Sequence, residues 1–289
     1  MPIKDSISGH TQVACLIGSP VAHSLSPALH NASFKETNTD AAFVAFDVKP
    51  EALGTVVPAL REMNVCGYSV TMPLKQEICP YLDELTPAAR LMNAVNTVVN
   101  KDGKSIGDNT DGAGFVENCR NHGFDPTGKT ITIVGAGGAA SAIITQLALE
   151  NVDCLYIFNR KDEFYDRQNE NLARITQETK CTIAMFPLED KAKLEECIAQ
   201  SELFINATRV GMAPLDDQCI IDPALLHEGL TVADVVYEPQ ETALLRHAKE
   251  RGLNTISGLG MLLQQAAISE KFWFEIDMPI DSIRNQFFA

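Results

Sequence analysis

The stretch Thr130-Ile-Thr-Ile-Val-Gly-Ala-Gly-Gly-Ala-Ala140 sets the fold class of this chain. Its first five residues predict a buried strand, and the apolar helical pattern that follows runs to about Leu149. The turn between them matches Gly-x-Gly-x-x-Gly/Ala, the pattern of a dinucleotide site at a strand-to-helix turn. Its glycines permit the tight turn and a close backbone approach to a pyrophosphate. A strand at Cys154–Phe158 completes a βαβ unit, so we predict a dinucleotide site; the alternative is a close-packed turn that binds nothing.

The patterns around this unit predict an α/β protein of two domains, because 289 residues exceed the usual length of a single domain. Residues 1–107 are expected to form an N-terminal α/β substrate domain, completed by residues 258–289. Residues 108–257 are expected to form a Rossmann-type, doubly wound dinucleotide-binding domain. The helical pattern from Met261 to about Glu275 predicts C-terminal helices that return to the first domain. Further strands are predicted at Val13–Ile17, Phe43–Val48, Gly67–Thr71, Asn96–Asn100, Lys104–Ile106, Thr182–Phe186, Leu203–Asn206 and Thr231–Val236, and further helices from Ser26, at Glu51–Met63 and at Phe115–His122.

Composition limits the classes of partner. The formal net charge is -15, from 38 acidic and 23 basic residues, which disfavours nucleic acid and anionic membranes. The longest apolar stretch, Ile131 to Leu149, is interrupted by glycine and polar residues, so we predict no membrane span. The eight cysteines show no zinc-ligand spacing, so we expect reduced thiols and no metal. The N-terminus has no signal-peptide pattern and indicates a cytoplasmic protein. A homodimer is compatible with the sequence.

A second motif suggests acid/base chemistry. Lys75 follows the predicted strand Gly67–Thr71, at the end of the strand where open α/β sheets bind ligands. Asp111 lies in Gly107-Asp-Asn-Thr-Asp-Gly112, just before the dinucleotide unit. A lysine and a carboxylate can exchange a proton with a hydroxyl while a dinucleotide takes the hydride from the same carbon. We therefore predict alcohol dehydrogenase chemistry with a proton shared among lysine, aspartate and substrate; the alternative is an ordinary surface pair.

The sequence Asn159-Arg160-Lys161-Asp162 follows the strand that holds the adenosine end in Rossmann-type sites. Arg160 is able to pair with the 2′-phosphate of NADP or stack on adenine. Asp162 is able to accept hydrogen bonds from an unphosphorylated ribose while repelling a phosphate. We expect NAD as the cofactor, with NADP use left open; a solvated charged loop is the alternative for each side chain.

At this point the residues closely resemble the shikimate dehydrogenase family, and within it the quinate/shikimate dehydrogenase branch. The resemblance spans nearly the whole chain. It implies reversible reduction of 3-dehydroshikimate to shikimate, a step toward chorismate and the aromatic amino acids, and leaves oxidation of quinate to 3-dehydroquinate open. The motifs that carry it are Ser24-Leu25-Ser26-Pro27, Val70-Thr-Met-Pro-Leu-Lys75, Asn96-Thr97, Asp108-Asn-Thr-Asp-Gly112, the glycine turn, Asn206-Ala-Thr208 and Gly258-Leu-Gly-Met-Leu-Leu-Gln-Gln265.

The resemblance also implies roles for individual residues. Lys75 and Asp111 match the family's catalytic pair. The residues that match substrate-binding groups are Ser24, Ser26, Thr71, Asn96, Tyr237 and Gln265. Those that match the cofactor surface are Gly135, Ala136, Gly137, Gly138, Ala139, Asn159, Arg160, Lys161, Asp162, Thr208, Arg209, Val236 and Gly258. The NADP-specific members typically continue Asn-Arg with threonine, whereas Lys161 follows here, as in the branch that accepts or prefers NAD.

The sequence is also compatible with other functions. A similar fold could bind quinate or shikimate and a nucleotide as a non-catalytic regulator, against which the intact Lys75 and Asp111 argue. A dehydrogenase of the same architecture could act on a folate or another alcohol, against which the Ser24/Ser26 pair argues. Isolated N-capping is the structural alternative for Ser26. His23 and His30 have no carboxylate at a fixed spacing and are expected to be structural, and Trp273 is expected in the core.

Overall fold

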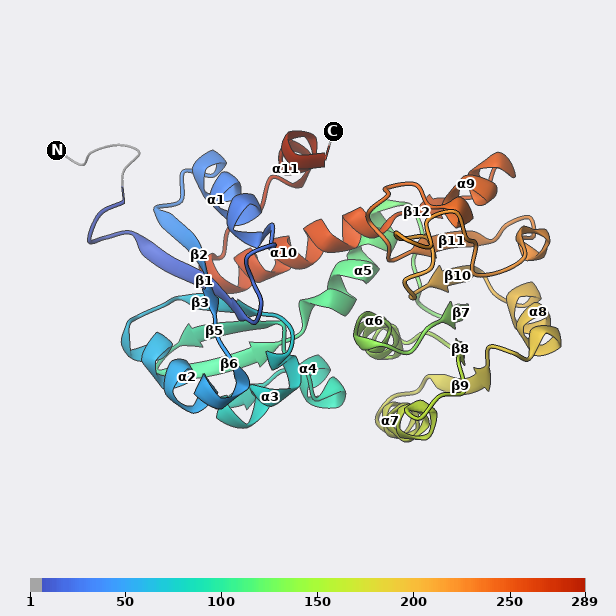
Figure 1. Ribbon diagram of the computed structural model, residues 1–289, viewed down its shortest axis with the longest axis horizontal. Helices are drawn as coiled ribbons and strands as arrows, with labels where there is room; N and C mark the ends of the chain where they lie inside the picture. Colours follow the sequence, from blue (N-terminus) through green and yellow to red (C-terminus); the bar gives the residue numbers. More distant parts are fainter. Residues whose placement is uncertain (1–6, 289) are drawn as a thin grey trace. The chain divides into compact units, whose positions relative to one another are not determined.

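The computed structural model describes residues 7–288 and divides into two compact units (Figure 1). Unit 1 contains the chain up to Thr110 and again from Gln265, and unit 2 contains Asp111–Gln264. The chain passes from one unit to the other inside two helices, α5 (Thr110–Asn121) and α10 (Gly258–Phe274). The divisions therefore lie three and seven residues beyond the sequence-based boundaries after residues 107 and 257.

Unit 1 is built on a mixed six-stranded sheet with the order β2-β1-β3-β5-β6-β4. The neighbours of β1 are parallel to it, whereas β5 runs antiparallel to both β3 and β6. The strands predicted at Asn96–Asn100 and Lys104–Ile106 form a hairpin. They are joined through Asp102 and Gly103, which both have positive φ as a tight hairpin turn requires. The strands are β1 (Gln12–Gly18), β2 (Ala41–Asp47), β3 (Gly67–Val70), β4 (Glu84–Leu85), β5 (Thr97–Lys101) and β6 (Lys104–Asp108).

Helices cover both faces of this sheet, because successive side chains of β1 pack against helices on opposite faces. Cys15 and Ile17 pack into one apolar cluster with residues of α2, and Ala14 and Leu16 into another with Phe34 of α1 and Trp273 of α10. A strand buried on both faces reads as a continuous apolar run, which Val13–Ile17 is. The helices of unit 1 are α1 (Ser26–Glu36), α2 (Leu53–Glu62), α3 (Leu74–Glu77), α4 (Pro87–Met92), the C-terminal half of α10, and α11 (Ile280–Phe288).

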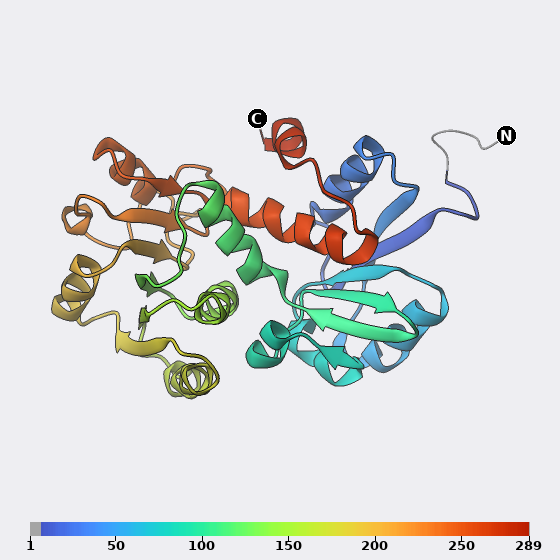
Figure 2. The same cartoon turned by 180° about the vertical axis from the view of Figure 1, so that it is seen from behind.

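Unit 2 is a parallel six-stranded sheet with the order β12-β11-β10-β7-β8-β9, so the predicted Rossmann-type, doubly wound fold is confirmed (Figure 2). Its central strand, β7, carries the glycine turn at its carboxyl end and has β8 and β10 as neighbours. The strands are β7 (Thr130–Val134), β8 (Cys154–Asn159), β9 (Thr182–Pro187), β10 (Leu203–Asn206), β11 (Thr231–Asp234) and β12 (Thr255–Ile256), and the remaining helices are α6 (Gly138–Leu149), α7 (Tyr165–Glu178), α8 (Lys191–Ala199) and α9 (Ala243–Glu250).

The alternative role of Ser26, as the N-cap of α1, is not found in the structure. The N-cap residue is Leu25, which makes no side-chain cap hydrogen bond. Ser26 is the first helical residue instead, and its backbone N–H donates to Ser24 Oγ at 3.2 Å. Ser24 thus supplies the capping oxygen from two residues upstream.

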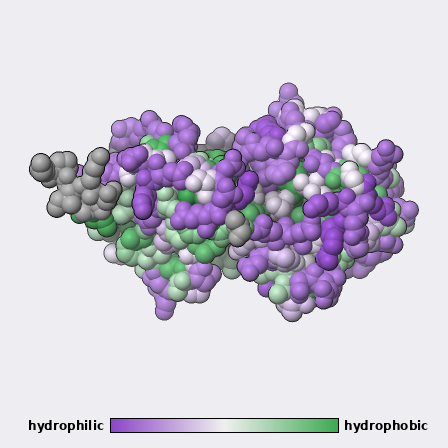
Figure 3. Space-filling model, turned by 90° about the horizontal axis from the view of Figure 1, so that it is seen from above, coloured by the Kyte–Doolittle hydropathy of each residue, from purple (hydrophilic) through white to green (hydrophobic). Residues whose placement is uncertain are grey.

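Hydrophilic residues predominate on the face shown in Figure 3, and apolar residues lie between them, more of them in the left half of the view. Such a surface accords with the large excess of acidic residues. Across residues 7–288, no helix combines the length and apolarity needed to cross a bilayer.

Candidate active site

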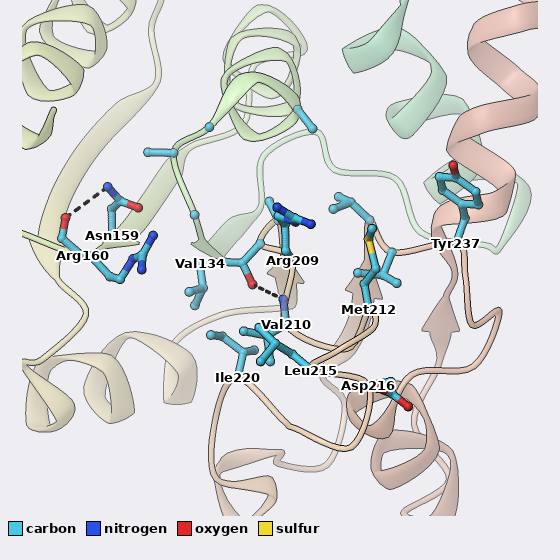
Figure 4. Close-up of a pocket in the computed structure, with 18 of the residues that line it drawn as sticks. Val134, Asn159, Arg160, Arg209, Val210, Met212, Leu215, Asp216, Ile220 and Tyr237 are labelled. Carbon is cyan, nitrogen blue, oxygen red and sulfur yellow. Dashed lines mark hydrogen bonds between the residues drawn. The ribbon is translucent and has the colours of Figure 1, made fainter. Parts of the chain in front are cut away.

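A cavity of about 1270 Å³ lies in unit 2 at the carboxyl ends of β7, β8, β10 and β11. This edge is where open α/β sheets bind their ligands. Figure 4 shows Asn159 and Arg160 on one side of the β7 turn and Arg209, Met212 and Tyr237 on the other. The arrangement follows from the strand order, because β8 and β10 flank β7.

The glycine turn has the backbone that a pyrophosphate site needs. Gly135 has a φ of +113°, and a Cβ at this position would lie 2.6 Å from the carbonyl oxygen of Ala207. Only glycine fits there without a shift of the backbone. Gly137 and Gly138 have open space where a Cβ would stand, at the N-terminus of the 12-residue helix α6. Exposed backbone N–H groups at a helix N-terminus favour an anion, so the residues present fit a bound dinucleotide.

Ten of the thirteen predicted cofactor residues line this cavity: Gly135, Ala136, Gly137, Gly138, Ala139, Asn159, Arg160, Thr208, Arg209 and Val236. Tyr237, predicted to line the substrate cleft, lines the same cavity. Lys161, Asp162 and Gly258 are not among its lining residues.

The positions of Asp162 and Gly258 have local explanations. The Asp162 carboxylate accepts a hydrogen bond at 3.0 Å from the backbone N–H of Phe164, so it organises the turn that enters α7. Gly258 packs directly against the backbone of Val235, where a Cβ would collide with the Val235 carbonyl group. Gly258 therefore packs against the loop after β11 without lining the cavity.

Sequence reasoning missed Gln168, which lies on α7. Its side-chain amide donates to the carbonyl oxygen of Ala136 at 3.0 Å, and its side-chain oxygen accepts from Asn159 at 2.7 Å. One side chain thus connects the glycine turn to the predicted adenosine end. No sequence signal marked it, because a glutamine in an amphipathic helix has the pattern of an ordinary surface residue.

In unit 1, the loops after β1 and β3 are held side by side. The backbone N–H of Ser19 donates to the carbonyl oxygen of Met72 at 3.0 Å, and that of Thr71 donates to Ile17 at 3.0 Å. These loops carry two groups of predicted substrate residues. The Ser24 and Ser26 hydroxyls lie 3.2 Å apart after β1, and Lys75, half-buried, lies in α3 after β3.

Asn96 and Gln265 belong to a separate hydrogen-bonded chain in unit 1. Asn96 is buried, and its side-chain oxygen accepts from the Thr110 N–H at 2.8 Å. The Thr110 hydroxyl lies 3.3 Å from that of Ser269, which donates to the carbonyl oxygen of Gln265 at 2.9 Å. These hydrogen bonds connect the residue before β5 to the start of α5 and to α10.

The two predicted catalytic residues lie in different units. Lys75 is in unit 1, and Asp111 is the first residue of unit 2, in the first turn of α5. On the unit 1 side, the carbonyl oxygen of Lys75 accepts from the Val95 N–H at 2.7 Å, and the neighbouring Asn96 holds Thr110. The backbone of Lys75 is therefore linked to the residue that precedes Asp111.

His30 is a buried structural residue, as expected, and it has a carboxylate partner that the sequence did not reveal. Its Nδ1 lies 2.7 Å from Glu270 Oε1, and the Ser33 hydroxyl donates to Glu270 Oε2 at 2.6 Å. His30 and Glu270 are 2% and 0% exposed, so the group is a buried connection between α1 and α10. The partner lies 240 residues away in sequence, which explains why no spacing revealed it. Trp273 is buried beside His30, as expected.

The eight cysteines are free thiols, five of them buried. Among residues 7–288, no group of three or more histidine, cysteine, aspartate or glutamate side chains is placed to hold a metal ion.

Two family models match separate parts of this chain. The family model described as the shikimate dehydrogenase substrate binding domain matches residues 16–98. The model described as the shikimate 5'-dehydrogenase C-terminal domain matches residues 258–286.

Full-length relatives give the same result. A shikimate dehydrogenase (NADP(+)) of Listeria monocytogenes is 44% identical over 287 residues, covering 99% of each chain. A quinate/shikimate dehydrogenase of Escherichia coli is 38% identical over 280 residues, covering 96% of this chain and 97% of that protein. A crystal structure of a shikimate 5-dehydrogenase from Listeria monocytogenes in complex with shikimate and NAD superposes with a TM-score of 0.96, at 44% identity and 99% coverage of each chain.

Proposed function

Because the chain belongs to the shikimate dehydrogenase family, we propose that it interconverts 3-dehydroshikimate and shikimate with NAD(P), and we assign its residues accordingly. It is an oxidoreductase that acts on a CH–OH group. The observation that carries this function is the cavity around the glycine turn Gly135–Ala139. It occurs in a chain that matches, over 99% of its length, a protein whose crystal structure contains shikimate and NAD.

In the oxidising direction, shikimate loses a hydride from the carbinol carbon and a proton from the hydroxyl group on that carbon. A nicotinamide bound in the cavity supplies the hydride acceptor. We assign the proton to Lys75 and Asp111 acting as a coupled pair. The overall reaction balances as shikimate plus NAD(P)⁺ giving 3-dehydroshikimate, NAD(P)H and H⁺. Two hydrogen bonds support this assignment, because they hold the backbone next to both side chains. The Val95 N–H donates to the carbonyl oxygen of Lys75, and the Thr110 N–H donates to the side-chain oxygen of Asn96.

We assign the substrate to the unit 1 groups Ser24, Ser26, Thr71, Asn96 and Gln265, with Tyr237 of unit 2. Neutral hydroxyls suffice for the carboxylate, since hydrogen bonds to an ionised acceptor are stronger than those to a neutral one. The closeness of the Ser24 and Ser26 hydroxyls, 3.2 Å, supports a shared role for them. The domain roles follow: unit 1 binds the substrate and unit 2 the cofactor.

Both nicotinamide dinucleotides suit the adenosine end. Arg160 lines the cavity and can pair with a 2′-phosphate, whereas Asp162 bonds its own loop. The Listeria relative is named for NADP(+), and the Listeria structure contains NAD. We propose that the protein prefers NAD and also accepts NADP, with Arg160 and Asp162 setting the ratio.

Quinate is the proposed second substrate, because the Escherichia coli relative is named for both acids. The cytoplasm is the proposed compartment, where free thiols such as the eight found here stay reduced. A homodimer stays a prediction, which sedimentation of the purified protein would test.

The function is tested by initial rates for shikimate and quinate, each with NAD and with NADP. We expect turnover of shikimate with both cofactors, faster at limiting NAD than at limiting NADP. Turnover in none of the four pairings would contradict the proposed function, and turnover of shikimate with NADP alone would contradict the proposed cofactor preference.

A further inference from the structure

A buried carboxylate lies behind the cofactor cavity. Asp234 ends β11 and is 1% exposed. Its Oδ1 accepts from the backbone N–H of Val236 at 2.9 Å, and its Oδ2 accepts from the Thr242 hydroxyl at 2.8 Å. Both oxygens also lie 3.1 Å from Nδ2 of Asn206. Burial raises the pKa of this carboxyl group to about 6, and the three donors oppose that rise.

Asn206 extends the network into the neighbouring loop. Its Nδ2 donates to the carbonyl oxygen of Val210 at 2.9 Å as well as to Asp234. Its Oδ1 accepts from the Thr208 hydroxyl at 2.7 Å and from the Thr208 N–H at 3.1 Å. The Thr208 hydroxyl in turn accepts from the Val210 N–H at 3.1 Å. The amide of Asn206 is therefore bonded at both ends, which fixes its orientation.

The network connects two loops that share one wall of the cavity. Thr208 and Val210 follow β10, Val236 follows β11, and all three line the cavity. Neither Asn206 nor Asp234 is a lining residue. In the sheet, β10 and β11 lie on one side of β7 and β8 lies on the other. The wall formed by the loops after β10 and β11 is therefore on the opposite side of the cavity from Asn159, at the adenosine end. It is the side left for the nicotinamide half of the cofactor.

We propose that Asp234, acting through Asn206, is a positioning residue that shapes the wall for the nicotinamide half of the cofactor. The proposal rests on the proposed function, because it requires that the cavity binds NAD(P). Asp234 does not touch the ligand in this account. It holds Val236 directly, and Thr208 and Val210 through Asn206, so its loss changes the shape of that wall and leaves the glycine turn and Asn159 in place.

ADP-ribose provides the probe, since it contains the adenosine and pyrophosphate parts of NAD and lacks nicotinamide. Calorimetry should show that Asp234→Asn weakens NAD⁺ binding about tenfold, which corresponds to about 1.4 kcal/mol. The same variant should change ADP-ribose binding by less than about twofold. Asn206→Ala serves as the second variant and should give the same split. In the double variant the losses should not add, because the two residues act as one unit.

Thr242→Val is the matched control. Thr242 bonds the same carboxylate but caps α9, accepting from the Leu245 N–H at 3.4 Å, and does not line the cavity. This variant should lose stability and keep both affinities. Equal weakening of NAD⁺ and ADP-ribose, or no weakening of either, in the Asp234 and Asn206 variants would overturn the inference alone. Wild-type protein that binds neither ligand would overturn the proposed function as well.

Discussion

The side-chain oxygen of Asn96 accepts a hydrogen bond from the backbone N–H of Thr110 at 2.8 Å. Thr110 opens α5, and its N–H is one of the four donors that a helix leaves without an intrahelical partner. Asn96 therefore acts as a remote cap, supplied by the segment between β3 and β5, for the helix that presents Asp111. A residue assigned to the substrate by resemblance thus also has a structural task.

Replacing Asn96 by alanine is expected to lower both stability and turnover. Loss of a helix cap costs about 1 kcal/mol, and the released first turn carries Asp111. Chemical denaturation and kcat for shikimate would measure the two effects. Asp190→Ala is the control, because Asp190 caps α8 by accepting from the Lys193 N–H at 3.0 Å. The control should lose stability alone; a loss of kcat equal to that of the Asn96 variant would refute the link to Asp111.

Replacing Lys75 by methionine should reduce kcat by a factor of about a hundred to ten thousand, the usual contribution of a positioned acid/base group. Binding of NAD should stay within about twofold of the wild type, because the cofactor cavity is lined by unit 2 residues. Lys104→Met removes an exposed lysine paired with Glu84 and serves as the control, with unchanged kcat. Near-normal turnover in the Lys75 variant would exclude its proposed role.

Arg160 and Asp162 should change cofactor choice in opposite directions. Arg160→Ala is expected to raise KM for NADP about tenfold more than KM for NAD, since a charge-assisted hydrogen bond to the 2′-phosphate is lost. Asp162→Ala should lower KM for NADP, because a negative charge near the phosphate is removed. Steady-state kinetics with both cofactors would measure these ratios. Equal changes in KM for NAD and for NADP in both variants would show that other residues set the cofactor preference.

Asp234 should make stability depend on pH in a defined direction. Its pKa is raised by burial from 3.8 to about 6, so between these values the folded protein binds more protons than the unfolded chain. Its contribution to the free energy of unfolding therefore falls by roughly 2.5 kcal/mol as pH rises from 4 to 7. Asp234→Asn lacks this titration.

Denaturation of wild type and Asp234→Asn at several pH values isolates the effect, because all other titrating groups cancel in the difference. The stability of the variant relative to the wild type should rise from pH 4 to pH 7. A difference that stays constant, or falls, would contradict the raised pKa.

Local sequence patterns predicted the parts of the structure whose determinants are local. The strand and helix around Gly135 follow from the period of apolar residues and from the glycine spacing, and the hairpin follows from Asp102-Gly103. The missed features depend on contacts between distant segments. Glu270 meets His30, and Asp234 meets Asn206, only after the chain has folded.

Short elements were also missed, for a related reason. The four-residue helix α3 and the two-residue strands β4 and β12 are too short to show a period. For the site, the glycine motif predicted the cavity, whereas the role of Gln168 depends on how α7 packs against the turn.

Isotope transfer tests the central claim most directly. Shikimate carrying deuterium on the carbinol carbon that becomes the ketone would be incubated with the purified protein and NAD⁺, and the reduced cofactor analysed by mass spectrometry. Direct hydride transfer predicts NADH that carries one deuterium atom for each molecule of 3-dehydroshikimate formed. Unlabelled NADH, or no reduced cofactor at all, would contradict the account.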